Sequence, residues 1–332
     1  MKIQGIILVL CIAIFSSCFQ EYFDHWESEH VEPKISTLNS GNLTGNLIVL
    51  PDEVELENLV KKLGAAKKRI WLETYTWTEK QTQDFVIAAK KRSVDVRVIL
   101  EGNVFQTPKI NDPVMKKLEE AQIDAVFASD AFTFTHMKMW IIDDEWCVST
   151  GNWSYTSFTK NREFIFCSND ESILHSLEEI FLSDFLHKRP LFSGSGMDSR
   201  IGLAPWNLRA FLSKEIEDAE TEILLYNQSI SDNEMLNHLS QKSKSGVRIE
   251  LCQSVKSSTG SNYQDIPLLT SEKPYLHAKI FLIDGVDILL GSANITQNAL
   301  DNNREIMIKI ENNPVFYKKI KNLYNIDCKR QP

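Results

Sequence analysis

The sequence predicts an α/β protein built from two copies of one unit, each a mixed β-sheet flanked by helices. Two observations predict this architecture. Segments with helical periodicity alternate with short apolar segments typical of strands, and the order of these segments in the first half recurs in the second half. A stretch over 188–205, rich in Gly, Ser and Pro, lies between the copies and is predicted to be a linker. We expect the two halves to pack with pseudo-two-fold symmetry.

In the first copy, helices are predicted where apolar residues recur on one face, as Leu56, Val60 and Leu63 do within 53–66. Further helices are predicted over 79–92, 111–121 and 171–187. Short runs rich in β-branched and aromatic residues predict strands. These runs are "RIWLETYTW" (69–77), "DVRVIL" (95–100), "DAVFA" (124–128), "HMKMWIID" (136–143), "EWCVST" (145–150) and "EFIFCS" (163–168).

The second copy repeats the first segment by segment. The matching segments are "LRAFLSKEIEDAETEILLYN" (208–227) with "ELENLVKKLGAAKKRIWLET" (55–74), "GVRIEL" (246–251) with "DVRVIL" (95–100), "HAKIFLID" (277–284) with "HMKMWIID" (136–143), and "NNREIMIKI" (302–310) with "KNREFIFCS" (160–168). A duplicated unit is the simplest account of this order. We therefore predict a first domain over 46–187 and a second domain over 206–327.

The N-terminal residues are typical of an export signal. Lys2 is followed by an apolar run over 6–15 that is shorter than a membrane span, and then by two serines and Cys18. Small residues directly before a cysteine resemble the bacterial lipobox, in which the cysteine is lipidated. We therefore predict a lipoprotein signal over 1–18 and an acidic tether over 19–45, in a protein that is exported and membrane-anchored, in the periplasm or on the cell surface of a bacterium. An ordinary cleaved signal and an uncleaved anchor are the alternatives.

The composition argues against some classes of function. A formal net charge of −9 disfavours general electrostatic binding to a nucleic-acid backbone, which requires a basic face. Beyond the signal, cysteines stand at Cys147, Cys167, Cys252 and Cys328 without C-x-x-C spacing, so we predict no zinc site. Export would permit a disulfide, and Cys147 and Cys167 lie in strands that flank one loop. Buried free thiols are nevertheless the favoured interpretation.

Two His-x-Lys segments mark the candidate site. Side chains at i and i+2 of a strand share one face, so His136 projects with Lys138, and His277 projects with Lys279. An acid seven residues after each histidine, an asparagine in the following turn and a glutamate at the next strand complete the two sets. These residues are Asp143, Asn152 and Glu163 in the first copy and Asp284, Asn294 and Glu305 in the second.

These residue types suit the cleavage of a phosphate diester. The lysines and asparagines supply positive charge and amide donors for the non-bridging phosphate oxygens. One histidine attacks phosphorus, while the other protonates the leaving oxygen and then activates water. A neutral attacking imidazole needs an acceptor on its far nitrogen, and Glu163 and Glu305 are the candidates, one for each histidine.

Each set also contains residues for which a structural role is the simpler explanation. Asp143 and Asp284 are included as candidate catalytic residues, although turn stabilisation accounts for them more simply. Arg162 and Arg304, which directly precede the two glutamates, are expected to form structural ion pairs.

The two sets resemble the phospholipase D superfamily, whose signature is H-x-K-x4-D followed by G-[SG]-x-N, once per half. "HAKIFLIDGVDILLGSAN" fits this signature throughout. "HMKMWIIDDEWCVSTGNWS" fits it through Asp143 and then departs, with its glycine one position late and Asn152 directly after it, which we interpret as a contracted loop. The resemblance covers residues 46–327. It implies the duplicated phospholipase D-like fold, a phosphohistidine on His136, an acid/base role for His277, and no metal or cofactor.

The predicted function is that of an exported phospholipase D-type phosphodiesterase that hydrolyses phospholipid head groups at a membrane surface. A transphosphatidylase resembling cardiolipin synthase is an alternative, because an alcohol can capture the same intermediate. An exported nuclease of the same superfamily and a binder of phosphorylated ligands without turnover are less favoured alternatives. Loops over 102–114 and 253–274 are expected at the rim of the cleft. A monomer is sufficient for a complete site, since one chain carries both motifs.

Overall fold

The computed structural model of the protein describes residues 43–187, 196–254 and 266–330. The predicted signal segment, Cys18 and most of the predicted tether lie outside these residues, so export and lipidation stay predictions. In the part of the chain that the structure describes, no helix combines the length and the apolar character needed to cross a membrane.

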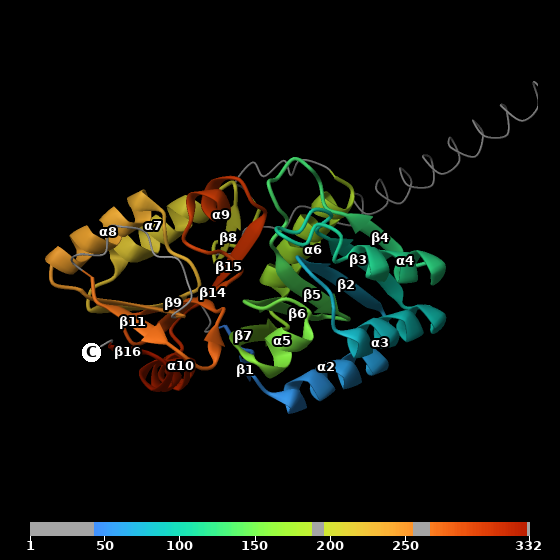
Figure 1. The fold of residues 1–332 in the computed structure, drawn as a ribbon, viewed down its shortest axis with the longest axis horizontal. Helices are drawn as coiled ribbons and strands as arrows, with labels where there is room; N and C mark the ends of the chain where they lie inside the picture. The colour runs from blue at the N-terminus through green and yellow to red at the C-terminus, as the bar shows by residue number, and fades with distance from the viewer. Residues whose placement is uncertain (1–42, 188–195, 255–265, 331–332) are drawn as a thin grey trace, which may run out of the picture. The chain divides into compact units, whose positions relative to one another are not determined.

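The first half folds around a mixed sheet with the strand order β1-β7-β6-β5-β2-β3-β4 (Figure 1). β2, β3 and β4 are parallel, and β5, β6, β7 and β1 follow as antiparallel neighbours. The strands are β1 (Asn46–Leu50), β2 (Arg69–Thr74), β3 (Asp95–Leu100), β4 (Asp124–Phe127), β5 (Lys138–Ile142), β6 (Glu145–Ser149) and β7 (Asn161–Ser168). The helices are α2 (Glu53–Ala65), α3 (Lys80–Lys91), α4 (Asp112–Glu120), α5 (Tyr155–Thr159) and α6 (Glu171–Phe185). The predicted helices and strands of this half are all present, and the histidine strand begins at Lys138.

The second half repeats this arrangement with the strand order β16-β11-β10-β9-β13-β14-β15-β8, which confirms the duplicated α/β fold. The strands are β8 (Ile201–Ala204), β9 (Glu222–Asn227), β10 (Arg248–Ser254), β11 (Leu268–Ser271), β12 (Tyr275–Leu276), β13 (Lys279–Ile283), β14 (Asp287–Gly291), β15 (Glu305–Ile310) and β16 (Lys329–Arg330). The helices are α7 (Leu208–Asp218), α8 (Asn233–Lys244), α9 (Gln297–Asp301) and α10 (Pro314–Asp327). The linker predicted over 188–205 extends too far, because β8 pairs with β15 as β1 pairs with β7. A short edge strand that contains a glycine gives little signal in the sequence.

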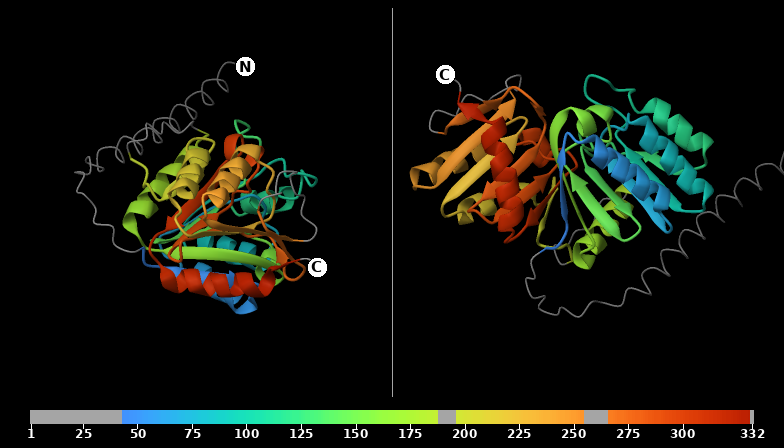
Figure 2. Two further views of the ribbon diagram at one scale, coloured as in Figure 1. Left: turned by 90° about the vertical axis from the view of Figure 1, so that its left-hand side faces the viewer. Right: turned by 90° about the horizontal axis from the view of Figure 1, so that it is seen from below.

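The described sheets and helices pack around three hydrophobic cores. α2, α3 and α4 pack on one face of the first sheet, and α7 and α8 pack on one face of the second (Figure 1). The other faces of both sheets meet α6 and α10 in a central core, to which the two histidine strands contribute Met139 and Ile280. Figure 2 shows the same elements from two further directions. Because the central core is continuous across both halves, it fixes the position of one histidine strand relative to the other.

The prediction of buried free thiols is wrong, because the described cysteines form disulfides. Cys147 and Cys167 are direct partners across the antiparallel strands β6 and β7, with their Cα atoms 4.1 Å apart. Cys252 on β10 bonds to Cys328, which follows α10. The second pair joins residues 76 positions apart in the sequence, and only the docking of α10 against the sheet brings them together.

Asp143 and Asp284 each bind the chain segment that leads into the neighbouring strand. Both lie at the end of their histidine strand that is remote from the histidine. Asp143 accepts hydrogen bonds of 2.7–3.3 Å from the backbone N–H groups of residues 67–69. Asp284 accepts bonds of 2.7–3.0 Å from those of residues 220–222. Their inclusion among the catalytic residues is therefore corrected, because both carboxylates bind the chain that enters β2 or β9 and the length of a strand separates them from the histidines.

We predict that Asp143→Asn lowers the free energy of unfolding by about 1–2 kcal/mol, because an amide oxygen accepts weaker hydrogen bonds than a carboxylate does. Asparagine tolerates the positive φ of 55° at this position, so the substitution removes the negative charge without adding backbone strain. Although burial opposes the shift, the N–H groups of residues 67–69 lower the pKa of Asp143. Its stabilisation is therefore present at neutral pH and is lost as the pH falls through the folded-state pKa.

Chemical denaturation at neutral pH and under acid measures this effect. Asp144→Asn is the matched control, because the Asp144 side chain forms a surface ion pair with Lys68 and its loss is expected to cost less than about 0.5 kcal/mol. Equal losses of stability in the two variants would contradict the assigned role.

Candidate active site

Each histidine is placed by a backbone contact with the other half of the molecule. Thr135 forms a parallel bridge with Arg304, and the N–H of His136 donates to the Arg304 carbonyl at 2.9 Å. In the same way β12, which directly precedes His277, pairs with β7, and the N–H of His277 donates to the Arg162 carbonyl at 3.3 Å. Each histidine therefore lies beside the Asn-Arg-Glu segment of the opposite copy.

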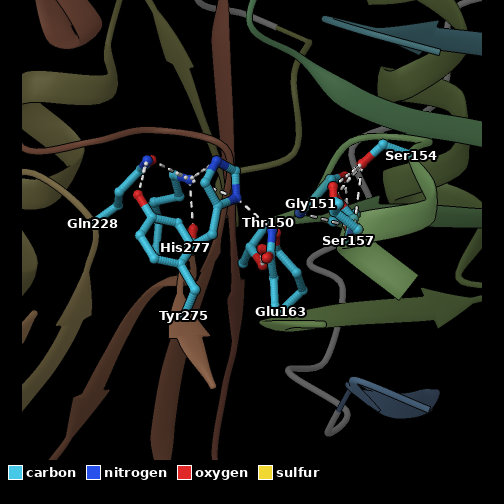
Figure 3. Close-up of polar contacts among 12 residues, drawn as sticks. Thr150, Gly151, Ser154, Ser157, Glu163, Gln228, Tyr275 and His277 are labelled. Atoms are coloured by element: carbon cyan, nitrogen blue, oxygen red, sulfur yellow. Dashed lines mark hydrogen bonds and ion pairs between the residues drawn. The ribbon is translucent and has the colours of Figure 1, made fainter. Parts of the chain in front are cut away.

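The glutamates of these segments hold the histidine rings. Nδ1 of His136 lies 2.9 Å from Oε2 of Glu305, and Nδ1 of His277 lies 2.7 Å from Oε1 of Glu163 (the second pair is drawn in Figure 3). A carboxylate only accepts hydrogen bonds, so each Nδ1 carries the proton and each Nε2 keeps its lone pair. The sequence predicted one glutamate for each histidine, but it did not show that the pairs cross between the halves.

Each glutamate is itself fixed by a hydroxyl and an amide that the sequence analysis missed. Thr150 donates to one oxygen of Glu163 at 2.7 Å, and Asn161 donates to the other at 3.3 Å. Ser292 and Asn303 bind the second glutamate in the same way, at 2.6 and 3.0 Å. The repeat held this signal, because aligning the copies on their glutamates also aligns the hydroxyl residues and the asparagines.

The loop after β6 is not contracted, which corrects the interpretation made from the sequence. The turn between β5 and β6 consists of Asp143 and Asp144, whereas the turn between β13 and β14 has the three residues 284–286. The missing residue of the first copy therefore lies in the hairpin turn, and Asn152 is the structural counterpart of Asn294. The Oδ1 atoms of both asparagines are buried and lack a hydrogen-bond partner among the described residues. Their contact with a phosphate stays a prediction.

Both lysines are fully buried beside their histidines. Lys138 Nζ donates to the backbone carbonyl of His136 at 2.6 Å, and Lys279 Nζ donates to that of His277 at 2.5 Å. Lys279 Nζ also lies 3.2 Å from the nitrogens of the His277 ring and donates to Oε1 of Gln228 at 3.2 Å. The structure therefore brings each His-x-Lys pair together on one side of the chain.

Burial controls the protonation of these groups. It lowers the pKa of His136 to about 4, with Glu305 opposing this shift and Lys138 adding to it. It also lowers the pKa of His277 from its ordinary value. It lowers the pKa of Lys279 to about 8 and that of Lys138 well below its usual range. His136 is therefore neutral near pH 7, the form in which an imidazole can attack phosphorus.

A domain family described as "Cardiolipin synthase, PLD-like domain" matches residues 59–185 and 212–326, one match in each half. The chain belongs to the phospholipase D superfamily. Cardiolipin synthase 1 of Bacillus anthracis and its counterpart in Bacillus cereus are each 24% identical to this superfamily member over 173 residues, 51% of the chain. The match covers 32% of each relative, so the chain spans about a third of the length of the curated relatives that it matches.

Solved structures show the same fold as this phospholipase D superfamily member. Phosphatidylserine synthase from Haemophilus influenzae has a TM-score of 0.68 at 12% identity, over 87% of this chain and 88% of that one. Polyphosphate kinase from Porphyromonas gingivalis also has a TM-score of 0.68, at 18% identity, over 90% of this chain and 53% of that one. At these identities the likeness shows the fold alone.

The arginines of the Asn-Arg-Glu segments form structural ion pairs, as the sequence predicted. Arg162 lies 2.7 Å from Asp327 on α10, and Arg304 lies 2.7 Å from Asp184 on α6. Each pair connects one half to a helix of the other. In this phospholipase D superfamily member the arginines therefore hold the two glutamate strands against the central core.

The two ion pairs differ in a third residue, which lies near the aspartate of each pair. The hydroxyl of Tyr226 donates to Asp327 at 2.9 Å, and the equivalent position in the first half is Glu73. Both oxygens of Glu73 and Oδ1 of Asp184 are buried without a hydrogen-bond partner in the described part of the chain. Burial and then the charge of Asp184 raise the pKa of Glu73 well above its ordinary value, while Arg304 lowers it. We therefore expect a protonated Glu73 in the place of the Tyr226 hydroxyl.

We predict that Glu73→Gln increasingly stabilises the protein as the pH rises. Because the folded-state pKa of Glu73 is raised, the folded wild type binds more protons than the unfolded chain above about pH 4.5, and it loses stability as the pH rises toward that pKa. Glutamine does not titrate, so the unfolding free energy of the variant minus that of the wild type grows by up to about 1.4 kcal/mol per pH unit.

Denaturation curves collected between about pH 5 and pH 8 measure this slope. Glu57→Gln, at an exposed position of α2, is the control and should show none of it. A difference in unfolding free energy between the variant and the wild type that stays constant over this range would mean that Glu73 is ionised in the folded protein.

Proposed function

We propose that this protein cleaves phospholipid phosphodiester bonds in two displacement steps, through a phosphohistidine on His136. The observation that carries the proposal is the pair of buried histidines, each held at Nδ1 by a glutamate of the other half and each beside a buried lysine. This arrangement leaves an Nε2 on each ring for chemistry at a phosphorus between them.

In the first step, Nε2 of His136 attacks phosphorus, and the P–O bond to the head-group alcohol breaks. His277 gives its Nε2 proton to the leaving oxygen. Although the free ring is held largely neutral, the bound diester brings a negative charge that favours its protonated form. Lys138 and Lys279 offset the charge on the non-bridging oxygens, in a site where burial strengthens that attraction.

In the second step, the neutral His277 takes a proton from an incoming water or alcohol, whose oxygen attacks phosphorus. The P–N bond to His136 breaks, and both rings regain their starting states. Water as the acceptor yields a phosphatidic acid, and an alcohol yields a new phosphodiester. Glu305 and Glu163 keep both rings in the productive tautomer through both steps.

Phospholipid as the substrate is supported by the names of the similar proteins, cardiolipin synthase and phosphatidylserine synthase. The net charge of −9 disfavours the polyanionic backbone of a nucleic acid. Hydrolysis needs only water as the acceptor and is our first candidate. Transfer to an alcohol, as in a transphosphatidylase, is the second candidate, and the names of the relatives favour it.

We predict that the substrate bis(p-nitrophenyl) phosphate distinguishes the role of His136 from that of His277. Its leaving group departs without a proton, so His277→Ala releases about one equivalent of p-nitrophenol in a burst and then stops as the phosphohistidine. His136→Ala gives no burst, and its steady-state rate falls by about 10³-fold or more. Quenched-flow measurement of p-nitrophenol, with mass spectrometry of the trapped protein, checks both outcomes. A burst in His136→Ala alone would reverse the two roles.

The same preparation decides the substrate class. Mixed phospholipid vesicles, vesicles with added glycerol, and single-stranded DNA are incubated separately, and the products are separated by chromatography. Phosphatidic acid supports hydrolysis, and a new phospholipid formed only with glycerol supports transfer. Cleavage of DNA alone would refute the proposed lipid substrate.

We predict that kcat/KM falls as the pH rises through about 8, because the buried Lys279 loses its charge with a pKa of about 8. Arginine stays charged over the whole range, so Lys279→Arg should move this decline to higher pH even where the overall rate is lower. The pH profile of kcat/KM is measured for both proteins. A decline that stays at the same pH in the Lys279→Arg variant would refute its assignment to Lys279.

A further inference from the structure

The two halves of the site carry different side chains at equivalent positions. Tyr75 directly follows the β2 residue that faces Lys138, and Gln228 directly follows the β9 residue that faces Lys279. Two residues before its histidine, the first half has Phe134 and the second has Tyr275. The shared fold places these positions alike in both halves. The different side chains therefore change the surface that lines the site and leave the course of the backbone around it the same.

The first half supplies an aromatic wall, which consists of Tyr75, Phe134 and Phe105. The Tyr75 ring stands edge-on to the His136 ring, with centroids 4.8 Å apart, and Lys138 Nζ lies 5.5 Å from its centre. Phe134 contacts Tyr75 at 6.0 Å and Phe105 at 6.4 Å between centroids. Phe105, on the predicted rim loop, is 67% exposed. The wall therefore runs as a continuous aromatic surface from His136 out to solvent.

The second half supplies a polar wall, which consists of Gln228 and Tyr275. Gln228 accepts from Lys279 Nζ at 3.2 Å, and its Nε2 donates to the Tyr275 hydroxyl at 3.1 Å (Figure 3). Since that hydroxyl oxygen accepts from Gln228, its own proton is left to donate to an oxygen of a ligand. Tyr275 is 39% exposed, so such a ligand can reach it from solvent.

We propose that these walls set the direction in which a diester binds. The aromatic wall receives the apolar, acyl-bearing alcohol, and the polar wall receives the hydroxylated head group. This inference rests on the proposed phospholipid substrate. An aromatic surface favours the burial of acyl carbon, whereas a hydroxyl and an amide fixed by hydrogen bonds favour a partner that can hydrogen-bond in return.

This binding direction also determines which ester oxygen lies beside His277. With the head group against Gln228 and Tyr275, the oxygen that must leave lies on the side of His277, the proposed proton donor. The acyl-bearing oxygen stays bonded to phosphorus, and its chains extend along the wall that begins at Tyr75. Binding in the opposite direction would put acyl chains against the polar wall and leave its hydrogen-bonding groups unpaired.

The test compares two ratios of kcat/KM on the full-length protein with monomeric short-chain lipids. The acyl ratio compares dihexanoyl- with dibutyroyl-phosphatidylglycerol, and the head-group ratio compares dibutyroyl-phosphatidylglycerol with dibutyroyl-phosphatidylmethanol. Phe105→Ser should lower the acyl ratio by about 5- to 30-fold, from the lost apolar contact. Tyr275→Phe should lower the head-group ratio by about 3- to 10-fold, from one lost hydrogen bond. Each variant should leave the other ratio within about twofold of the wild type.

Val315→Ser, at a 72% exposed apolar position of α10, is the control for surface hydrophobicity and should move neither ratio. If Phe105→Ser moves the head-group ratio and Tyr275→Phe moves the acyl ratio, the proposed direction is reversed. Phospholipid turnover with both ratios unchanged would refute the walls while leaving the proposed function intact. Turnover of bis(p-nitrophenyl) phosphate without turnover of any phospholipid would refute the proposed function and the walls with it.

Discussion

The architecture depends on the crossed pairing of each histidine with the glutamate of the opposite copy. His136 meets Glu305 and His277 meets Glu163, because the residues just before each histidine bond to the β-strand of the other half. One half taken alone would leave its histidine without the glutamate that accepts from Nδ1, and it would expose the sheet face that forms the central core. The central core that joins the sheets is therefore also what assembles the site.

The charges behind the site follow the same crossed pattern, but the surroundings differ between the halves. Arg162 and Arg304 each reach a helix of the other half, so the strands that carry the glutamates are held from both sides. A buried ion pair is stable only while both partners are present, which gives these strands little freedom to move independently. The copies differ in the third residue near each ion pair, which is Glu73 in the first half and Tyr226 in the second. They also differ in the proposed walls of the site. The halves thus agree at the histidines, lysines and glutamates of the candidate site and differ at the side chains of the two proposed walls.

Sequence reasoning succeeded where chemistry follows from spacing along one chain segment and failed where it depends on which segments are neighbours. The i, i+2 spacing placed each lysine with its histidine, and the repeat placed the two sets in one site. Asp143 belongs to the same motif as His136, but a strand holds it at the opposite end of the sheet. Likewise, Cys252 and Cys328 meet only because α10 docks on the second sheet. The one-residue difference between the copies was assigned to the wrong turn, because only strand register locates it.

By itself, the sequence determined the duplicated α/β fold, the family signature and the identity of the histidines, lysines and glutamates of the site. Periodicity and motif spacing are local properties, and they survive without knowledge of long-range contacts. Only the tertiary structure decided which glutamate serves which histidine, which side chains line each wall, and that the aspartates brace the fold. Those outcomes depend on contacts between residues far apart in the chain, which form only when both sheets close on the central core.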